Sequence, residues 1–257
     1  MGQLIQQEIF KFRHQRLAWL APVILSLLMV GLAMTTHGAS ASDQKFYISS
    51  AYGGFQWVTI LMIVIAASGV TMEFEYGTIK QLAIQVNHRW TIFVGKYVLV
   101  LGYSVLLHGV VILMTLLLKG SGGRNLMWQS VYLYHQSLLV NLVTNAVLDM
   151  YGGMMIIGLV FLLASCSHNS AAAIAIGVGV CFTGEGVSSL LLQSFKSLLP
   201  VMKWNPFNMF FLQEEYGNPS YQQNVTHLTI QQLGVGNLVW ALFFVGVGAV
   251  IFSRRRI

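Results

Sequence analysis

The chain has 257 residues, of which 56% are apolar and only 9% are charged, and its formal net charge is +6. A soluble domain carries about 25% charged residues, so a surface this poor in charge favours lipid as its solvent. The mean hydropathy of +0.68 agrees with this. Composition therefore argues against a nucleic-acid-binding protein, because the basic residues sit at the ends of apolar segments.

Residues 1–16 precede the first long apolar segment and place Ile5, Ile9 and Phe12 on one helical face. Polar side chains, including Lys11, fall on the other faces. This pattern predicts an amphipathic helix that lies along the membrane surface. The alternative is a basic lead-in to the first membrane span.

Six segments are long and apolar enough to cross a bilayer, whose core of about 30 Å needs roughly 20 helical residues. Backbone groups in lipid must be satisfied within the segment, so each span is expected to be an α-helix. The predicted spans are residues 17–36, 51–71, 92–118, 137–163, 170–192 and 233–252. The sequence thus predicts an all-α integral membrane protein in which residues 1–257 form a single transmembrane domain.

The loops and termini on the two sides of the membrane differ in their content of lysine and arginine. One side holds nine of these residues, including those at both termini, and the other side holds five. Cytoplasmic flanks are richer in lysine and arginine, so both termini are predicted to be cytoplasmic.

Residues 73–90, between the second and third spans, are therefore predicted to be cytoplasmic. Glu73 and Glu75 end the second span, Gly77 permits a turn, and Thr78 can cap a helix that begins at the next residue. That short helix would carry Leu82 on an apolar face, which suits docking in a groove of a partner. An ordinary polar loop is the alternative.

Two acids, Asp149 and Glu185, lie inside predicted spans. A charge near the bilayer centre costs roughly 2.5–3.5 kcal/mol on insertion scales, so such residues usually face protein or water. They could line a polar translocation path. Equally, each could bond a neighbouring helix or mark a helix break, since glycines flank both positions.

The fifth span has small residues in register at Ala171, Ala175 and Gly179. This spacing lets helices approach closely, either within one bundle or between two copies of the chain.

Residues 193–232 would then lie outside the cell, and they combine aromatic residues with three prolines. Non-helical backbone at membrane depth must be buried in protein or face water. We therefore expect short external helices in the outer boundary of the membrane before the last span.

The cytoplasmic stretch resembles the permease subunits of ATP-binding-cassette (ABC) type-2 exporters. Those subunits carry Glu-x-Glu-x-Gly-Thr after the second span, then a leucine-rich helix, an arginine and a lysine entering the third span. The matching residues here are Glu73, Glu75, Gly77, Thr78, Leu82, Arg89 and Lys96. The family's Pro-x-Ser before the arginine is replaced by Val86-Asn87-His88. The overall plan is also similar, above all to the bacteriocin-immunity and peptide-antibiotic resistance permeases.

This resemblance implies a permease of the bacterial cytoplasmic membrane that exports a hydrophobic or amphipathic substrate. The expected partners are a separate ATPase subunit, which docks on the loop, and a second permease chain, identical or homologous. ATP and magnesium would bind to the ATPase, because this chain has no GxxxxGK[ST] loop. No cofactor, metal ligand or catalytic residue is predicted in this chain.

Two other classes of protein remain as alternatives. A membrane-embedded enzyme acting on lipid would need acids or histidines clustered at one depth, and the sequence offers only isolated Asp149 and Glu185. A non-transporting membrane partner or sensor would explain the spans but not the Glu-x-Glu-x-Gly-Thr stretch.

Overall fold

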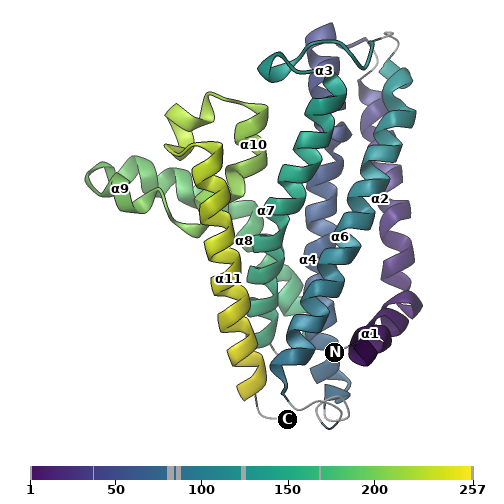
Figure 1. The fold of residues 1–257 in the computed structure, drawn as a ribbon, viewed down its shortest axis with the longest axis vertical. Helices are drawn as coiled ribbons and strands as arrows, with labels where there is room; N and C mark the ends of the chain where they lie inside the picture. The colour runs from purple at the N-terminus through teal and green to yellow at the C-terminus, as the bar shows by residue number, and fades with distance from the viewer. Residues whose placement is uncertain are drawn as a thin grey trace.

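The computed structural model describes residues 2–36, 38–79, 84, 88–122, 126–167 and 169–255. Across these residues the structure is helical and contains no β-strand, apart from one isolated bridge between Val131 and Ser137. Six helices are long and apolar enough to cross a membrane, and they run side by side along the long axis (Figure 1). The prediction of an all-α membrane protein is confirmed.

The six long helices begin and end within four residues of the predicted spans. They are α2 (Arg16–Thr35), α4 (Gly54–Glu75), α6 (Trp90–Leu118), α7 (Leu138–Cys166), α8 (Ser170–Ser194) and α11 (Ile230–Arg254). Three of them start at a residue whose side chain accepts a hydrogen bond from a backbone N–H of the first turn: Ser137, Asn169 and Thr229. Such caps satisfy amide groups that the helix itself cannot.

Helix α7 occupies the centre of the bundle, where it packs against α4, α6, α8 and α11. In the core, Phe93 of α6 meets Phe161 of α7 edge to face, with ring centroids 5.3 Å apart. Gly248 of α11 makes room for this contact, because a Cβ atom there would lie 2.8 Å from Phe93 Cζ. Side-chain packing of this kind holds membrane helices together where lipid offers no hydrophobic drive.

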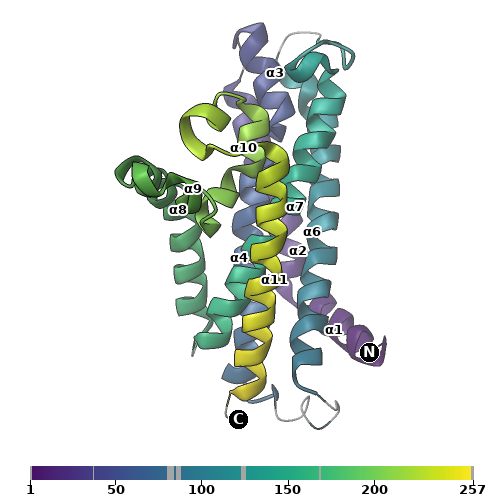
Figure 2. The same ribbon diagram turned by 60° about the vertical axis from the view of Figure 1, so that its left-hand side comes forward.

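Helix α1 (Gly2–His14) crosses the end of the bundle at which both termini lie (Figures 1 and 2). It ends at His14, and the extended backbone of Gln15 (ψ 128°) turns the chain into α2. Its Phe12 packs edge to face on Tyr103 of α6, with ring centroids 4.8 Å apart. The lead-in is thus a helix, and its position along a membrane surface stays a prediction.

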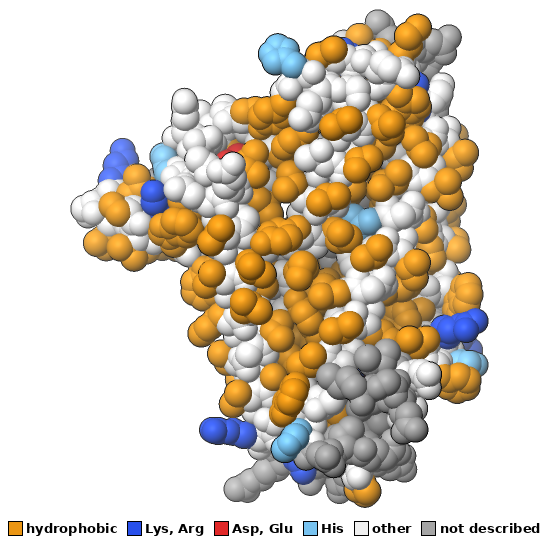
Figure 3. Space-filling view, in the orientation of Figure 1, with side chains coloured by type: hydrophobic (Ala, Val, Ile, Leu, Met, Phe, Trp, Pro, Cys, Tyr) orange, Lys and Arg blue, Asp and Glu red, His pale blue; other side chains and the backbone are white. Residues whose placement is uncertain are grey.

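Short helices gather at the other end of the bundle. They are α3 (Ala41–Ser49), η1 (Ala51–Gly53), η2 (Lys119–Gly122), η3 (Leu133–His135), η4 (Lys196–Leu198), α9 (Leu199–Met202), η5 (Pro206–Phe211), α10 (Leu212–Gly217) and η6 (Gln222–Thr226). The segment between α8 and α11 is helical as expected, and its α9 arm projects sideways (Figure 2). Apolar side chains cover the visible flank of the bundle, while lysines and arginines lie mainly toward its ends and on this arm (Figure 3).

Candidate functional site

Four charged side chains meet where α1, α4 and α6 come together, and we call this group the ionic junction: Glu8, Lys11, Glu73 and Lys96. The Lys96 ammonium donates to Glu8 Oε2 at 2.6 Å and to Glu73 Oε1 at 3.0 Å. The Lys11 ammonium lies 3.1 Å from Glu73 Oε1 and 3.5 Å from Glu8 Oε1. Two acids thus face two bases, and all but Lys11 are buried.

The burial of the ionic junction determines its effect on the stability of the protein. Breaking a buried ion pair by removing one partner costs about 3–5 kcal/mol, because it leaves an uncompensated charge. An intact buried pair adds little net stability for the same reason, since both ions lose hydration. The ionic junction therefore specifies how α1, α4 and α6 sit against one another more than it stabilises the bundle.

Glu75 lies two residues after Glu73 and contacts a different helix. Its Oε1 accepts from the Ser170 backbone N–H at 2.5 Å and its Oε2 accepts from the Ser170 hydroxyl at 2.8 Å. Ser170 is the first residue of α8, where unpaired N–H groups carry partial positive charge that a carboxylate stabilises. Thr71 of α4 also donates to the Ser170 hydroxyl at 2.8 Å. Glu75 thus fastens the end of α4 to the start of α8.

The turn after α4 follows the sequence pattern. Gly77 adopts a left-handed backbone conformation (φ 68°), which glycine allows at no steric cost. The Thr78 hydroxyl donates to Glu73 Oε2, so it ties the turn back to the ionic junction. Leu82 and most of the helix predicted after Thr78 lie outside the described residues.

Arg89, at the start of α6, is separate from the ionic junction. Its Nη1 donates to the Arg255 backbone oxygen at 3.3 Å, near the carboxyl end of α11. Arg255 in turn stacks over the ring of Phe74, with its guanidinium carbon 4.0 Å from the ring centroid. Arg89 is therefore linked to α4 through the end of α11.

The sequence interpretation missed two members of the ionic junction, Glu8 and Lys11. A signal was present, because Glu8 falls on the same helical face as Ile5, Ile9 and Phe12. An acid within an apolar face is costly unless it is paired, so it indicates a buried partner on another element.

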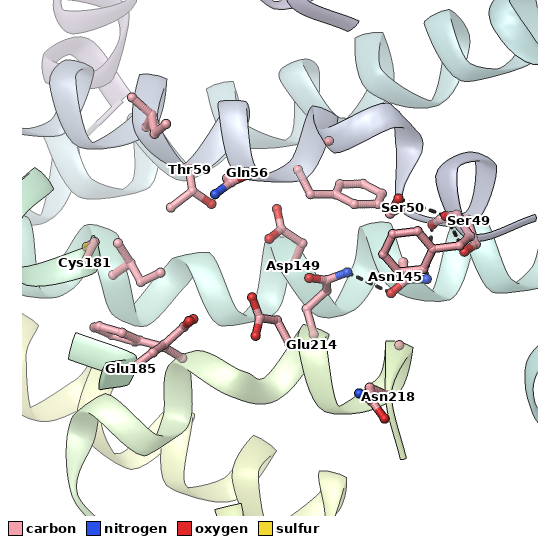
Figure 4. A pocket seen from close by; sticks show the side chains of 18 of the residues that line it. Ser49, Ser50, Gln56, Thr59, Asn145, Asp149, Cys181, Glu185, Glu214 and Asn218 are labelled. Carbon is pink, nitrogen blue, oxygen red and sulfur yellow. Dashed lines mark hydrogen bonds between the residues drawn. The ribbon is translucent and has the colours of Figure 1, made fainter. Parts of the chain in front are cut away.

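A second site lies toward the opposite end, where a cavity of 580 Å³ opens between α4, α7, α8 and α10 (Figure 4). Its polar lining comes from α4 (Gln56, Thr59), α7 (Asn145, Asp149), α8 (Glu185) and the segment around α10 (Gln213, Glu214, Asn218). Its apolar lining includes Phe55, Ile60, Ile63, Ile156, Phe182 and Phe210. The cavity thus brings together both acids that the sequence placed inside spans.

Asp149 lines this cavity and also bonds a neighbouring helix. Its Oδ2 lies 2.9 Å from Nε2 of His108, a buried residue of α6. The other ring nitrogen, Nδ1, lies 2.7 Å from the Ser104 backbone oxygen, which can only accept, so Nδ1 carries a proton. One further proton is shared between Nε2 and Oδ2, and with it the pair has no net charge.

The helix breaks that flanking glycines suggested at the two acids do not occur. Helix α7 runs without interruption through Asp149, and α8 runs through Glu185. Neighbouring helices supply enough packing to hold glycines in helical conformation in a membrane bundle.

Glu185 and Glu214 face the cavity from α8 and α10 (Figure 4). Within the described part of the chain, neither carboxylate has a hydrogen bond or an ion pair. The sequence interpretation missed His108, because its partner Asp149 lies 41 residues away, and it missed Glu214, because α10 lies outside the predicted spans.

Among the described residues, no group of three or more His, Cys, Asp and Glu side chains is placed to hold a metal ion. Both cysteines, Cys166 and Cys181, are free thiols. Cys181 lies on the wall of the cavity.

Comparison with known proteins identifies the family. Residues 4–184 match the family described as ABC-2 family transporter protein. The chain belongs to this family. The matched region holds the ionic junction, Glu75 and Asp149, and it ends one residue before Glu185. The resemblance carried by the Glu-x-Glu-x-Gly-Thr stretch is thereby confirmed, and the chain is a membrane subunit of an ABC transporter.

Two relatives from Bacillus subtilis (strain 168) are similar to this ABC-2 protein. It is 30% identical over 226 residues to the uncharacterized membrane protein YdbK, covering 84% of the chain and 85% of YdbK. It is 26% identical over 145 residues to the uncharacterized protein YhcI, covering 53% of the chain and 46% of YhcI. The chain thus spans about half the length of YhcI.

Proposed function

We propose that this chain is the permease subunit of an ABC exporter in a bacterial cytoplasmic membrane. A separate ATPase subunit binds ATP and magnesium, and a second permease chain, identical or homologous, completes the transporter. The substrate is a hydrophobic or amphipathic molecule, of the kind exemplified by peptide antibiotics, bacteriocins, drugs and lipid-like compounds. Membership of the ABC-2 family and the relatives from a bacterium support this proposal.

The observation that carries the proposal is the set of contacts around the end of α4. Helix α4 ends there and α6 begins at Trp90, so the ATPase would dock on the segment between the two helices. Glu73 joins that point to α1 and α6, and Glu75 joins it to α8. A push on the loop would therefore move four helices together instead of bending one.

Two of these helices also form the wall of the cavity. Gln56 and Thr59 lie on α4, and Glu185 lies on α8. If α4 and α8 move as a unit relative to α7, the cavity changes shape, and this gives ATP binding at one end a means of acting on substrate at the other. Coupling of this type requires an element with two arrangements that both sites influence.

The test is a Leu82→Asp variant, which puts a charge on the predicted docking face of the loop helix. Buried apolar anchors at an interface cost about 2 kcal/mol or more when replaced, so pull-down of the ATPase and its stimulated ATP hydrolysis should both fall at least tenfold. Gln81→Asp, on a different face of the same predicted helix, is the matched control and should keep both. Wild-type pull-down and hydrolysis in a correctly inserted Leu82→Asp protein would refute the docking assignment.

One observation favours a second candidate, a membrane-embedded enzyme acting on lipid. The cavity gathers Asp149, Glu185 and Glu214, and His108 contacts Asp149 from behind the wall; the sequence did not reveal this clustering. Such an enzyme would convert lipid without the ATPase, and Asp149→Asn would abolish the conversion. Lipid analysis of vesicles that hold only this chain separates the two functions.

A further inference from the structure

The cavity between α4, α7, α8 and α10 has an unbalanced charge. Among the described residues that line it are three carboxylic acids and no lysine, arginine or histidine. His108 reaches Asp149 from behind the wall and offsets its charge. Glu185 and Glu214 have no such partner in the described part of the chain, so they leave the cavity with two uncompensated carboxyl groups.

Glu185 lies where charge is costly. It is nine residues from the end of α8, which places it about 14 Å along the helix at 1.5 Å per residue. Like charges also disfavour each other's ionised form, and Glu214 faces the same cavity as Glu185. A positive group placed between them would relieve both penalties.

The rest of the lining suits the apolar part of an organic molecule. Phe182 of α8, Phe210 of η5 and Ile63 of α4 line the same cavity as the two acids. Aromatic ring faces attract organic cations within about 6 Å as well as contacting apolar groups. The volume of 580 Å³ falls within the range of roughly 300–1,000 Å³ typical of small-molecule sites.

We infer that this cavity binds a lipophilic or amphipathic organic cation, with its positive group between Glu185 and Glu214 and its apolar part against Phe182, Phe210 and Ile63. The inference rests on the proposed function and narrows it, because it names the charge of the molecule to be exported. An anion of the same shape would be repelled by the two acids, and a neutral analogue would leave them uncompensated.

Binding of two ions of the same shape and opposite charge tests this. Tetraphenylphosphonium and tetraphenylborate are added to the full chain in nanodiscs of uncharged lipid, and protein-free nanodiscs give the partitioning background. We expect saturable binding of the cation and none of the anion. The double variant Glu185→Gln/Glu214→Gln should weaken cation binding at least about tenfold, as expected for loss of charged partners at a binding site.

Asp43→Asn is the matched control, because Asp43 is an acid of α3 at the same end of the bundle but outside the lining of the cavity. It should leave binding unchanged. Thermal unfolding of each variant checks that the glutamine side chains, which keep the size of glutamate, preserve the fold. Saturable binding of both ions alike, no saturable binding of the cation, or an equal loss in the control would overturn the inference.

This measurement uses the permease alone, so it is independent of the ATPase. Selective cation binding without ATPase association would refute the proposed exporter and leave the cation site standing. ATPase association that depends on Leu82, without selective cation binding, would refute the cation site and leave the proposed exporter standing.

Discussion

Lys96 is the residue on which the ionic junction depends, since it contacts both buried acids. A Lys96→Met variant would leave Glu8 and Glu73 with only the half-exposed Lys11. We expect a loss of about 3–5 kcal/mol in the free energy of unfolding, because a buried charge would then be uncompensated. Unfolding in detergent by a graded denaturant measures it.

Removing both partners of one contact separates pairing from packing. The double variant Lys96→Met/Glu8→Gln deletes the 2.6 Å pair as a whole and leaves Glu73 paired with Lys11, so it should recover most of the stability lost in Lys96→Met. A Lys96→Met protein as stable as wild type, or a double variant no more stable than Lys96→Met, would show that the four charges do not act as a group.

For single residues, the sequence showed which side chains matter but did not show which residues they contact. Glu73 and Glu75 stood out because they end an apolar span and begin the Glu-x-Glu-x-Gly-Thr pattern, and both make specific contacts. Their partners Lys96 and Ser170 lie 23 and 95 residues away. Contacts that close across such distances depend on how helices pack, which one-dimensional periodicity does not encode.

Two glycines of α11, one in close contact with other helices and one not, allow a matched pair of substitutions that tests helix packing. A Cβ atom at Gly248 would lie 2.8 Å from Phe93 Cζ and 3.3 Å from the Leu162 Cα, whereas one at Gly246 would meet nothing within 4 Å. Gly248→Ala should therefore lower the free energy of unfolding by about 1–3 kcal/mol, because it overpacks the core. Gly246→Ala should be neutral or stabilising by up to about 1 kcal/mol, since alanine favours the helix.

Thermal unfolding of both variants in the same detergent makes the comparison. Equal effects of the two substitutions would mean that α11 does not pack on α6 and α7 as closely as the distances indicate.

The elements themselves were largely predictable. Apolar length gave all six spans, and the caps Ser137, Asn169 and Thr229 account for where three of them begin. Helix breaks at Asp149 and Glu185, one of the alternatives that the sequence left open, do not occur, because packing holds a helix through residues of low intrinsic propensity. The predicted loop helix with Leu82 stays a prediction.

For the whole molecule, both chain ends lie at one end of the bundle, as six spans require (Figure 1). Lysine and arginine counts predict that this end is cytoplasmic. Single cysteines in a background without Cys166 and Cys181 test this in intact cells. A cysteine at Lys203 should react with an impermeant reagent, and one at Arg89 should not; the opposite pattern would invert the topology.

The central claim is that movement of the cytoplasmic loop reaches the cavity through α4 and α8. Cys181 reports on it directly, because this thiol lies on the cavity wall in α8, and Cys166→Ser makes it the single cysteine. In proteoliposomes holding the permease and its ATPase, the rate of Cys181 labelling should change when ATP is added. Glu75→Ala, which removes the contacts of α4 with Ser170 of α8, should abolish the change while ATP is still hydrolysed. A labelling rate that is the same with and without ATP, in a complex that hydrolyses ATP, would contradict the account.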